Sequence, residues 1–343
     1  MAMLQARMIA PGEILIEQVP KPAVIPGHVL LKVLDIGICG SDIHVYHGKH
    51  PYTSYPVIQG HEFSAEVAEV GQGVSDLVPG QIVTVEPSLT CGSCYSCRHG
   101  RYNICDRLKV MGFQTDGAAR EYFLVPASNV VPLPTGFPRD LGALIEPLAV
   151  AVHAVRRFGD VQGRKILVLG AGPIGNLVAQ TVKALGASAV AITDRNPFRL
   201  GIASHCGLET VICIEDAASA DQLRSFLAPD GPDGILECVG VQHTIEQAVM
   251  VARKGSRIVV VGVFGDKPRV DMGLVQDREL ELIGSLMYRR EDYVEAIRLV
   301  QENLVRLRPL ITHNFPIVDY LQAYKLIDDQ PEKVMKVLIN VAQ

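Results

Sequence analysis

Four cysteines in one short segment could together bind a metal ion. They lie in "CGSCYSCRHGRYNIC" with the spacing C-x2-C-x2-C-x7-C, as Cys91, Cys94, Cys97 and Cys105. Four thiolates on a segment that is free to curl can close a tetrahedral zinc site, which is structural because it leaves no position for a substrate. Such a site has a formal charge of −2, which neighbouring basic residues could offset: Arg98, His99, Arg101, Arg107 and Lys109. Redox-active thiols and an iron–sulfur cluster are the alternatives.

A second set of possible ligands is spread over two motifs. "GICGSDIH" (37–44) contains Cys39, and "GHE" (60–62) contains His61 and Glu62. Sulfur, nitrogen and oxygen donors with one open position are what a catalytic zinc site uses. Each residue has a plainer interpretation, as buried filler or as a satisfied histidine. Only a fold could bring the two motifs together.

A glutamate in an apolar stretch needs a partner. "DLGALIEPLAVAVHAV" (140–155) places Glu146 among leucine, isoleucine, alanine and valine residues. Burying a carboxylate there without a partner would cost several kcal/mol or keep it protonated.

A glycine-rich turn between a strand and a helix predicts a dinucleotide site. "KILVLG" (165–170) is typical of a buried parallel strand, and "GAGPIG" follows with Gly170, Gly172 and Gly175. The glycines would let the backbone approach a pyrophosphate at the helix N-terminus. The next strand ends on Asp194, which would bind the adenosine ribose and repel a 2′-phosphate. This favours NAD over NADP, although Arg195 weakens the preference, and a βαβ unit without cofactor is the alternative.

Four more short strands follow, separated mostly by helical stretches. They are "TVICI" (210–214), "GILECVG" (234–240), "SRIVVVGVFG" (256–265) and "LELIGS" (280–285). Six strands are the number of a full Rossmann sheet, whose ligands bind at the carboxyl ends of the strands. A nicotinamide would then lie near Val239, Val261, Gly262 and Val263, for which core packing is the alternative.

The other elements have different patterns. Short alternating segments before residue 150 predict β-structure: "HVLLKVLDIG" (28–37), "FSAEVAEVG" (63–71) and "QIVTVEP" (81–87). We expect a helix near 291–303 and a terminal strand in "KVMKVLINV" (333–341). A length of 343 residues suggests two domains.

Charge and hydropathy exclude several classes of protein. The net charge of −5 argues against a nucleic-acid partner. The segment "MAMLQARMIAPGE" lacks the apolar core of a signal peptide, and glycines and a proline interrupt "ILVLGAGPIGNLVAQTV", the longest nearly uncharged stretch. We expect a soluble, cytoplasmic protein with no membrane partner.

Taken together, these motifs resemble those of the zinc-dependent medium-chain dehydrogenases, most closely the polyol (sorbitol-type) branch with its sugar-acid relatives. "GICGSDIH", "GHE", the cysteine segment, "IEPLAVAVHAVRR", "GAGPIG" and "VVVGVF" follow the family order over essentially the whole chain. The resemblance implies an α/β and β fold. A GroES-like β-barrel-type catalytic domain would span 1–150, with a structural zinc lobe at about 88–108. A Rossmann doubly wound parallel sheet would span 151–288, and 289–343 would return to the catalytic domain.

The resemblance also implies site residues and cofactors: one catalytic zinc, one structural zinc and NAD. It places Cys39, His61 and a carboxylate around the catalytic zinc, with either Glu62 or Glu146 as the third ligand and Asp42 orienting His61. Glu146 would then be buried against a cation. A substrate hydroxyl would lose its proton through Ser41 and then His44, for which a turn residue and a surface histidine are the alternatives. Further cofactor contacts would come from Pro173, Ile174, Arg199, Leu286 and Met287.

The substrate is expected to be a polyol or a sugar acid oxidised at a secondary hydroxyl. The polyol branch carries an Arg–Tyr pair after the last Rossmann strand, but "LMYRRED" has Tyr288 and Arg289 in the reverse order, which puts sorbitol itself in doubt. Basic residues could favour an anionic substrate or form a solvated surface: His47, Lys49, His50, Arg289 and Arg290.

Other activities and the oligomeric state remain open at this point. Threonine and simple alcohols are alternative substrates. A zinc-free quinone or enone reductase and a non-enzymatic zinc interaction protein are rival classes, which metal analysis and a cofactor titration would separate. Members of the family are commonly dimers or tetramers that pair through the edge of the Rossmann sheet. "ELIGS" (281–285) could serve in this way, so we expect a homo-oligomer, a homotetramer in particular.

Overall fold

The computed structural model describes residues 2–214 and 217–342. The chain forms two compact units. The first contains the residues up to Glu146 and those from Ile311 onward, and the second contains Pro147–Leu310. The C-terminal segment therefore returns to the first unit.

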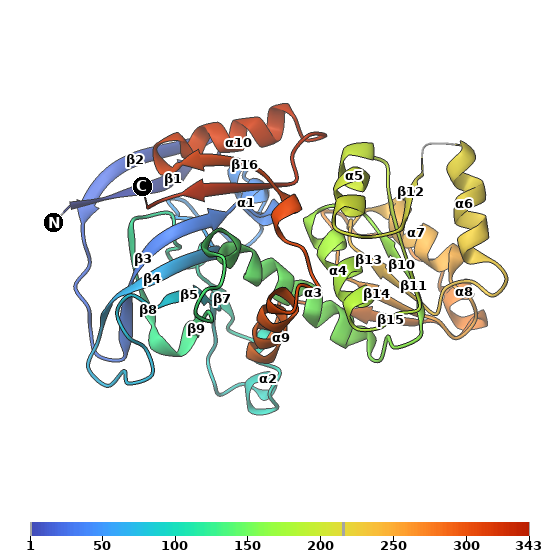
Figure 1. Cartoon of the computed structure of the whole chain (residues 1–343), viewed down its shortest axis with the longest axis horizontal. Coiled ribbons are helices and arrows are strands. Elements are labelled where there is room, and N and C mark those ends of the chain that lie inside the picture. Colours follow the sequence, from blue (N-terminus) through green and yellow to red (C-terminus); the bar gives the residue numbers. More distant parts are fainter. Residues whose placement is uncertain (1, 215–216, 343) are drawn as a thin grey trace. The chain divides into compact units, whose positions relative to one another are not determined.

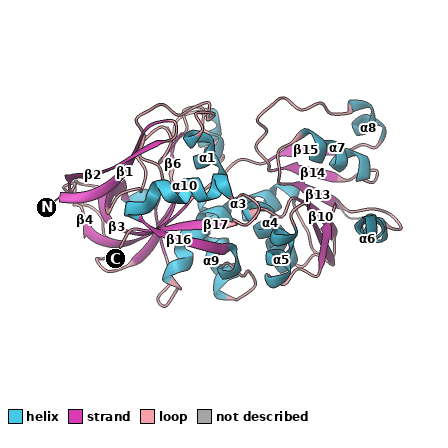
Figure 2. Cartoon of the chain, turned by 90° about the horizontal axis from the view of Figure 1, so that it is seen from above, coloured by secondary structure: helices cyan, strands magenta, loops and turns pink. Residues whose placement is uncertain are grey.

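The first unit is mostly β-structure, as the alternating segments predict. One seven-stranded sheet has the order β16-β17-β3-β4-β5-β9 with β8 also paired to β3, and β1–β2 and β6–β7 form two small sheets (Figures 1 and 2). The strands are β1 (Ala2–Ala10), β2 (Glu13–Pro20), β3 (His28–Gly37), β4 (Glu62–Val70), β5 (Ile82–Val85), β6 (Ser88–Leu89), β7 (Lys109–Val110), β8 (Tyr122–Pro126), β9 (Val130–Pro132), β16 (Ile311–Pro316) and β17 (Lys336–Asn340).

Short helices and turns connect these strands. The helices are α1 (Gly40–Tyr46), α2 (Tyr95–Arg98) and α10 (Tyr320–Asp329), and the 3-10 turns are η1 (Tyr102–Ile104), η2 (Ala127–Asn129), η3 (Arg139–Leu144) and η5 (Ile317–Asp319). Strand β3 lies inside the sheet, and most of its side chains are buried. Strand β17 pairs antiparallel with it, with Leu338 opposite Gly37 and Ile339 opposite Ile36. The end of the chain thus lies beside the segment that leads to Cys39.

The second unit contains the six parallel strands that the sequence predicts. Their order is β12-β11-β10-β13-β14-β15, the order of a doubly wound dinucleotide-binding sheet. They are β10 (Lys165–Leu169), β11 (Ala189–Asp194), β12 (Thr210–Cys213), β13 (Gly234–Glu237), β14 (Arg257–Val260) and β15 (Glu281–Gly284). Buried apolar residues such as Leu167, Ile235 and Ile258 form its core.

Helices cover both faces of this sheet, with α4 and α5 on one side and α7 and α8 on the other (Figures 1 and 2). The helical elements are α3 (Ile145–Phe158), α4 (Pro173–Ala184), α5 (Pro197–His205), α6 (Ala217–Leu227), α7 (Gln242–Val251), α8 (Met272–Asp277), α9 (Arg290–Gln301) and the turn η4 (Arg308–Leu310). Burial of apolar residues against the sheet accounts for the helical spacing after the glycine turn.

The boundaries of the units differ from the expected ones. We expected the returning segment to begin at 289, but α9 belongs to the second unit and the return begins at Ile311. A buried polar contact explains the difference. Asp292 on α9 is fully buried and lies 2.9 Å from His153 Nδ1 and 3.0 Å from Arg156 Nη1, both on α3. Similarly, the first unit ends at Glu146 rather than at 150, because α3 packs with the second unit after its first turn.

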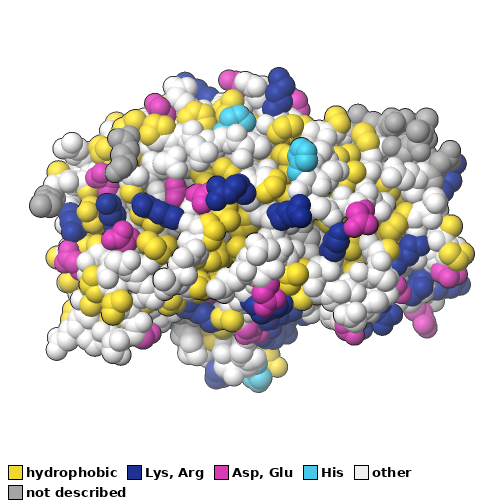
Figure 3. Space-filling view, in the orientation of Figure 1, with side chains coloured by type: hydrophobic (Ala, Val, Ile, Leu, Met, Phe, Trp, Pro, Cys, Tyr) yellow, Lys and Arg dark blue, Asp and Glu magenta, His cyan; other side chains and the backbone are white. Residues whose placement is uncertain are grey.

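Charged side chains of both signs occur across the face drawn in Figure 3, with hydrophobic side chains between them. Within residues 2–214 and 217–342, no helix is long and apolar enough to cross a membrane.

Candidate functional site

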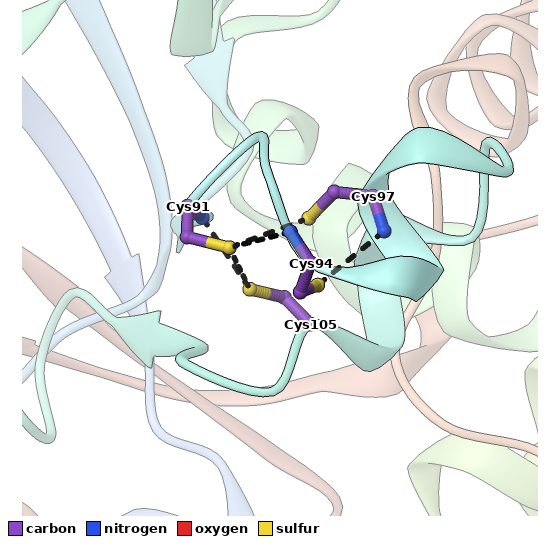
Figure 4. A group of neighbouring side chains, drawn as sticks. All are labelled: Cys91, Cys94, Cys97 and Cys105. Carbon is purple, nitrogen blue, oxygen red and sulfur yellow. Dashed lines mark hydrogen bonds between the residues drawn. The ribbon is translucent and has the colours of Figure 1, made fainter.

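The four cysteines of the predicted zinc lobe come together. Their sulfur atoms all lie within 4.8 Å of one another, with Cys91 and Cys105 sulfurs 3.5 Å apart and Cys91 and Cys97 sulfurs 4.0 Å apart. Figure 4 shows their side chains converging from the loop around α2. These distances are much longer than a disulfide bond, and the arrangement is the one a tetrahedral Cys₄ site needs.

Backbone N–H groups point at these sulfurs. Those of Cys91, Cys94 and Cys97 donate to sulfurs of the cluster at 3.3–3.5 Å, and that of Arg107 donates to Cys105 Sγ at 3.3 Å. Hydrogen bonds from the backbone N–H groups of Ser93 and Cys94 lower the pKa of Cys91 to about 5. The pKa of Cys97 is raised to about 12, mainly by burial. Donors that stabilise thiolates suit a metal with four sulfur ligands, so the residues present fit zinc.

The end of β3 and the start of β4 bring the second ligand set together. Gly37 ends β3 opposite Glu62, the first residue of β4, and Cys39 follows as the N-cap of α1. The candidate ligand atoms of Cys39, His61 and Glu62 all lie within 4.8 Å of one another. A Cβ at position 37 would meet Glu62 Oε2 at 2.3 Å. A side chain at position 37 would therefore displace the Glu62 carboxylate, which Lys336 holds in place.

Asp42 contacts two of these candidate ligands, and its contact with His61 is the one that the sequence analysis expects. Its Oδ1 lies 3.5 Å from His61 Nδ1, and its Oδ2 accepts a hydrogen bond from the backbone N–H of Cys39 at 3.0 Å. Burial lowers the pKa of His61, but its close interactions with Asp42 and Cys39, the charge of Asp42 first of all, outweigh burial and raise this pKa well above its ordinary value. Negatively charged groups that favour a proton on a buried imidazole would also favour a metal cation at the same place.

Lys336 is a residue of this site that sequence reasoning missed. Its Nζ lies 2.7 Å from Glu62 Oε2 and 3.0 Å from Oε1, and it also donates to the carbonyl of Ile38 at 3.2 Å. Both side chains are buried. Burial alone would lower the pKa of Lys336, but Glu62, Cys39 and Glu146 raise it. The sequence did contain a sign of this contact, which is a lysine within the apolar strand "KVMKVLINV". A buried lysine needs an anionic partner, just as the buried Glu146 needs a cationic one.

Glu146 lies in the first turn of α3 and is only 5% exposed. Its charge is one of those that raise the pKa of Lys336, which places it near the same group. Among the described residues, the set whose ligand atoms lie within 4.8 Å contains Glu62 and not Glu146.

The expected relay residues both lie on α1. Ser41 is half-buried in its first turn, and His44 is exposed near its end. Three of the basic residues near this site have defined surroundings. His47 pairs with Asp328 at 2.9 Å, the ring of His50 stacks on Phe113 with centroids 4.8 Å apart, and Lys49 is exposed.

The glycine turn of the second unit has the geometry of a phosphate-binding loop. Gly170 has a φ of +97°, and a Cβ at Gly175 would meet Gly170 O at 1.9 Å. The backbone conformation at Gly170 and the close packing at Gly175 therefore require glycine whether or not a ligand is bound. At Gly172, the N-cap of α4, the atom nearest to a Cβ would be Arg199 Nη1 at 4.0 Å. Packing therefore leaves open space beside Gly172, which suits the approach of a phosphate.

Asp194 supports this turn directly. Its Oδ2 accepts a hydrogen bond from the backbone N–H of Ala171 at 2.6 Å, and its Oδ1 accepts one from that of Asn196 at 2.8 Å. A carboxylate has about four acceptor positions, so both oxygens can still accept from a ribose. The predicted cofactor residues Pro173 and Ile174 begin α4, and Arg199 lies on α5.

The remaining predicted cofactor residues follow the carboxyl ends of β13, β14 and β15. Val239 is 41% exposed, Val263 73% and Leu286 51%. Val261 is half-buried, Met287 has a left-handed backbone with φ +51°, and a Cβ at Gly262 would meet Gly240 N at 2.2 Å. Exposed apolar side chains at this edge suit the flat face of a nicotinamide.

Sequence reasoning also missed Glu237, which braces these loops. It is fully buried, and its Oε1 accepts from the N–H groups of Val239 at 2.9 Å and Gly240 at 2.8 Å and from Thr244 Oγ1 at 2.7 Å. Its backbone carbonyl accepts from Val261 and Gly262. A glutamate in the apolar strand "GILECVG" was the signal.

The segment after β15 buries its tyrosine and pairs its arginine with an acid. Tyr288 is fully buried and packs edge-to-face against Tyr293, with ring centroids 5.0 Å apart. Arg289 pairs with Glu291 at 2.8 Å. Within the second unit Tyr288 is a core residue.

Two family models match the chain. Residues 25–135 match the alcohol dehydrogenase GroES-like domain, and residues 173–302 match the zinc-binding dehydrogenase model. The chain is 37% identical over 317 residues to 2-dehydro-3-deoxy-L-galactonate 5-dehydrogenase of Pseudoalteromonas atlantica, with 92% of each chain covered. It is 34% identical to L-threonine 3-dehydrogenase of Pyrococcus horikoshii, again with 92% of each chain covered.

A solved structure shares the whole fold. Galactitol-1-phosphate dehydrogenase from Escherichia coli superposes with a TM-score of 0.91 at 31% identity, covering 99% of this chain and 100% of that one. The two family models, the cysteine cluster and the dinucleotide-binding sheet agree: the chain belongs to the zinc-binding alcohol dehydrogenase family, with a GroES-like domain and a Rossmann domain.

Proposed function

We propose that the protein is an NAD-dependent zinc dehydrogenase that reversibly oxidises a secondary hydroxyl of a polyol or sugar acid to a ketone. The convergence of Cys39, His61 and Glu62 within 4.8 Å carries this proposal, because a mixed sulfur, nitrogen and oxygen set suits a catalytic rather than a structural zinc. The substrate class is supported by the relatives whose names specify a galactonate derivative and galactitol 1-phosphate.

Cys39 and His61 would hold the catalytic zinc together with Glu62 or Glu146, and the four-cysteine cluster would hold the structural zinc. Charge balance supports the presence of both carboxylates. Positive charge would come from the ion and from Lys336, and negative charge from Cys39, Glu62 and Glu146. The sum is zero, so Lys336 allows a second carboxylate to be buried beside the metal without excess negative charge.

The chain's own residues would move the proton. When bound, zinc supplies a Lewis acid that lowers the pKa of a substrate hydroxyl, and NAD supplies the hydride acceptor. Ser41 and His44 are three residues apart on α1 and therefore lie on one face of the helix. A proton accepted at Ser41 could pass to His44, whose exposed ring can release it to water. Asp42 would keep the His61 ring in the orientation that directs Nε2 to the metal.

Asp194 should make NAD the preferred cofactor. Asp194→Ser removes the negative charge and keeps a side-chain oxygen that can accept a hydrogen bond. We expect the ratio of kcat/KM for NADP to that for NAD to rise about tenfold or more, which corresponds to about 1.4 kcal/mol of removed repulsion. Steady-state kinetics with both cofactors measures this ratio. In Arg195→Ala, a matched control, the ratio should not rise, and an unchanged ratio in Asp194→Ser would refute the role of the carboxylate.

A substrate panel tests the proposed reaction. With NAD and zinc-loaded protein, we expect polyols or aldonates to give a kcat/KM at least about tenfold above that of simple primary alcohols, because binding of several hydroxyls contributes to transition-state stabilisation. Primary alcohols reacting faster than every polyhydroxy compound would contradict the substrate class. L-Threonine belongs in the panel, since a relative 34% identical to this chain acts on it by name. A higher kcat/KM for threonine would establish this second candidate function instead.

We also propose a cytoplasmic homo-oligomer, a dimer or tetramer. β15 is the edge strand of its sheet, with Leu282 37% exposed and Ile283 half-buried. An edge with unpaired backbone groups and apolar side chains is suited to pairing with a second copy. Light scattering measures the subunit number, and a monomeric mass would refute the proposal.

A further inference from the structure

A chain of buried polar side chains runs from the proposed catalytic zinc site to the C-terminal helix α10. Behind Asp42 lies Gln59, whose Nε2 donates to Asp42 Oδ1 at 3.1 Å and to the Asp42 carbonyl at 3.2 Å. Behind Gln59 lies Tyr324, whose hydroxyl donates to Gln59 Oε1 at 2.8 Å. Asp42, Gln59 and Tyr324 are at most 2% exposed.

We infer that Gln59 and Tyr324 are positioning residues that hold Asp42 against His61 and thereby fix the imidazole as a metal ligand. This inference rests on the proposed catalytic zinc site. The candidate ligands all lie in the first 146 residues of the chain. The inference adds Gln59 from the same part and Tyr324, which lies 265 positions after Gln59.

The hydrogen-bonding groups allow one consistent arrangement. An ionised carboxylate only accepts hydrogen bonds, so Gln59 must turn its NH₂ group toward Asp42. The amide oxygen then faces away, and the hydroxyl of Tyr324 must donate to it. Without that hydroxyl the amide loses the partner that holds its orientation. The other oxygen of Asp42 accepts from the backbone N–H of Cys39, so a shift of Asp42 would disturb two ligands.

The surroundings hold Tyr324 in place. Its ring lies 5.0 Å from that of Tyr46 and 5.5 Å from that of Tyr320, measured between centroids, and it belongs to the apolar core of the first unit. Desolvating an amide and a hydroxyl in such a core is unfavourable unless both are satisfied. The satisfied chain is therefore a rigid support for Asp42, and α10 contributes to the metal site as β17 does through Lys336.

Zinc retention tests this inference without relying on activity. Purified protein is dialysed against a graded series of a chelator, and zinc per chain is measured by mass spectrometry, with the four-cysteine zinc as an internal reference. We expect Gln59→Leu to weaken binding of the catalytic zinc about tenfold and Tyr324→Phe about threefold, since the neutral hydrogen bond to Gln59 is lost. The double variant should be no weaker than Gln59→Leu, because both residues act through one contact with Asp42.

Two further variants separate positioning from packing. Gln59→Met keeps the length and the approximate shape of the side chain but cannot donate to Asp42, so we expect it to lose about as much zinc affinity as Gln59→Leu. Tyr55→Phe is the matched control, because its hydroxyl donates to the Val45 carbonyl in the same unit. It should lose thermal stability as Tyr324→Phe does and keep its zinc affinity.

The outcomes are distinct. Gln59→Leu and Tyr324→Phe variants that lose thermal stability but bind the catalytic zinc like the wild type would show a purely structural network and overturn the inference. Full zinc affinity in Gln59→Met would do the same. A wild-type protein that binds only the four-cysteine zinc would overturn both this inference and the proposed catalytic site, whereas a normal two-zinc wild type confines any failure to the inference.

Discussion

Replacing Cys39 with serine is expected to reduce kcat about 10³-fold or more. A neutral hydroxyl binds zinc far more weakly than a thiolate does, and His61 and the carboxylates alone would hold the ion poorly. The Lewis acid contributes several kcal/mol to the reaction, and each 1.36 kcal/mol is about a factor of ten in rate. Steady-state kinetics and zinc analysis of the same preparation measure both consequences. The variant should keep the four-cysteine zinc and lose the other.

The control for this prediction is another cysteine. Cys206 is buried at the end of α5, and its Sγ lies 3.6 Å from the carbonyl of Arg306. Cys206→Ser should keep two zincs and wild-type kcat. Undiminished activity in Cys39→Ser with one zinc per chain would mean that the reaction does not use the proposed metal site.

Replacing Lys336 with methionine is expected to destabilise the protein by about 3–5 kcal/mol, the typical effect of leaving a buried charge without its partner. Glu62 would lose the ammonium group that lies 2.7 Å from its Oε2, while Cys39 and Glu146 would leave excess negative charge at the site. Urea denaturation followed by circular dichroism gives the change in unfolding free energy. Lys336→Arg, which keeps the charge, should lose much less.

A second substitution and the pH dependence identify the cause. Adding Glu62→Gln to Lys336→Met removes the unpaired charge and should recover part of the stability. Because the pKa of Lys336 is raised above 10.5 in the folded state, its contribution to stability is fully present at neutral pH and is lost as pH rises through the raised value. The difference between wild type and Lys336→Met should therefore be constant at neutral pH and shrink only above about pH 10.5. Equal stabilities of the two proteins at neutral pH would refute the role of the ion pair.

Much of the fold follows from local patterns. The expected strand at 28–37 has the observed bounds of β3, and all six expected strands of the second unit are present. Alternating side chains and continuous apolar runs indicate which residues of a strand are buried, so each strand can be predicted from its own segment. The cysteine cluster is local as well, because its ligands lie within 15 consecutive residues.

The candidate metal site around His61 could be predicted only in part. Cys39, His61 and Glu62 could be selected by residue type and motif, and Glu146 by its apolar surroundings. The partners of Lys336 and Tyr324 could not be predicted. The sequence does not state which strand β17 joins or in which register, nor against which residues α10 packs. A shift of one residue would turn Lys336 to the other face of the sheet.

The sequence by itself determined the two kinds of unit, the cysteine cluster, the glycine turn after β10 and the types of the candidate ligands, since each depends on neighbours in the chain. Only the tertiary structure decided that Lys336 on the last strand contacts Glu62, that Tyr324 on the last helix contacts Gln59, and that the return begins at Ile311 rather than at 289. These contacts join residues about 270 positions apart. They depend on how buried charges and hydrogen bonds are satisfied across the whole first unit, which no local pattern encodes.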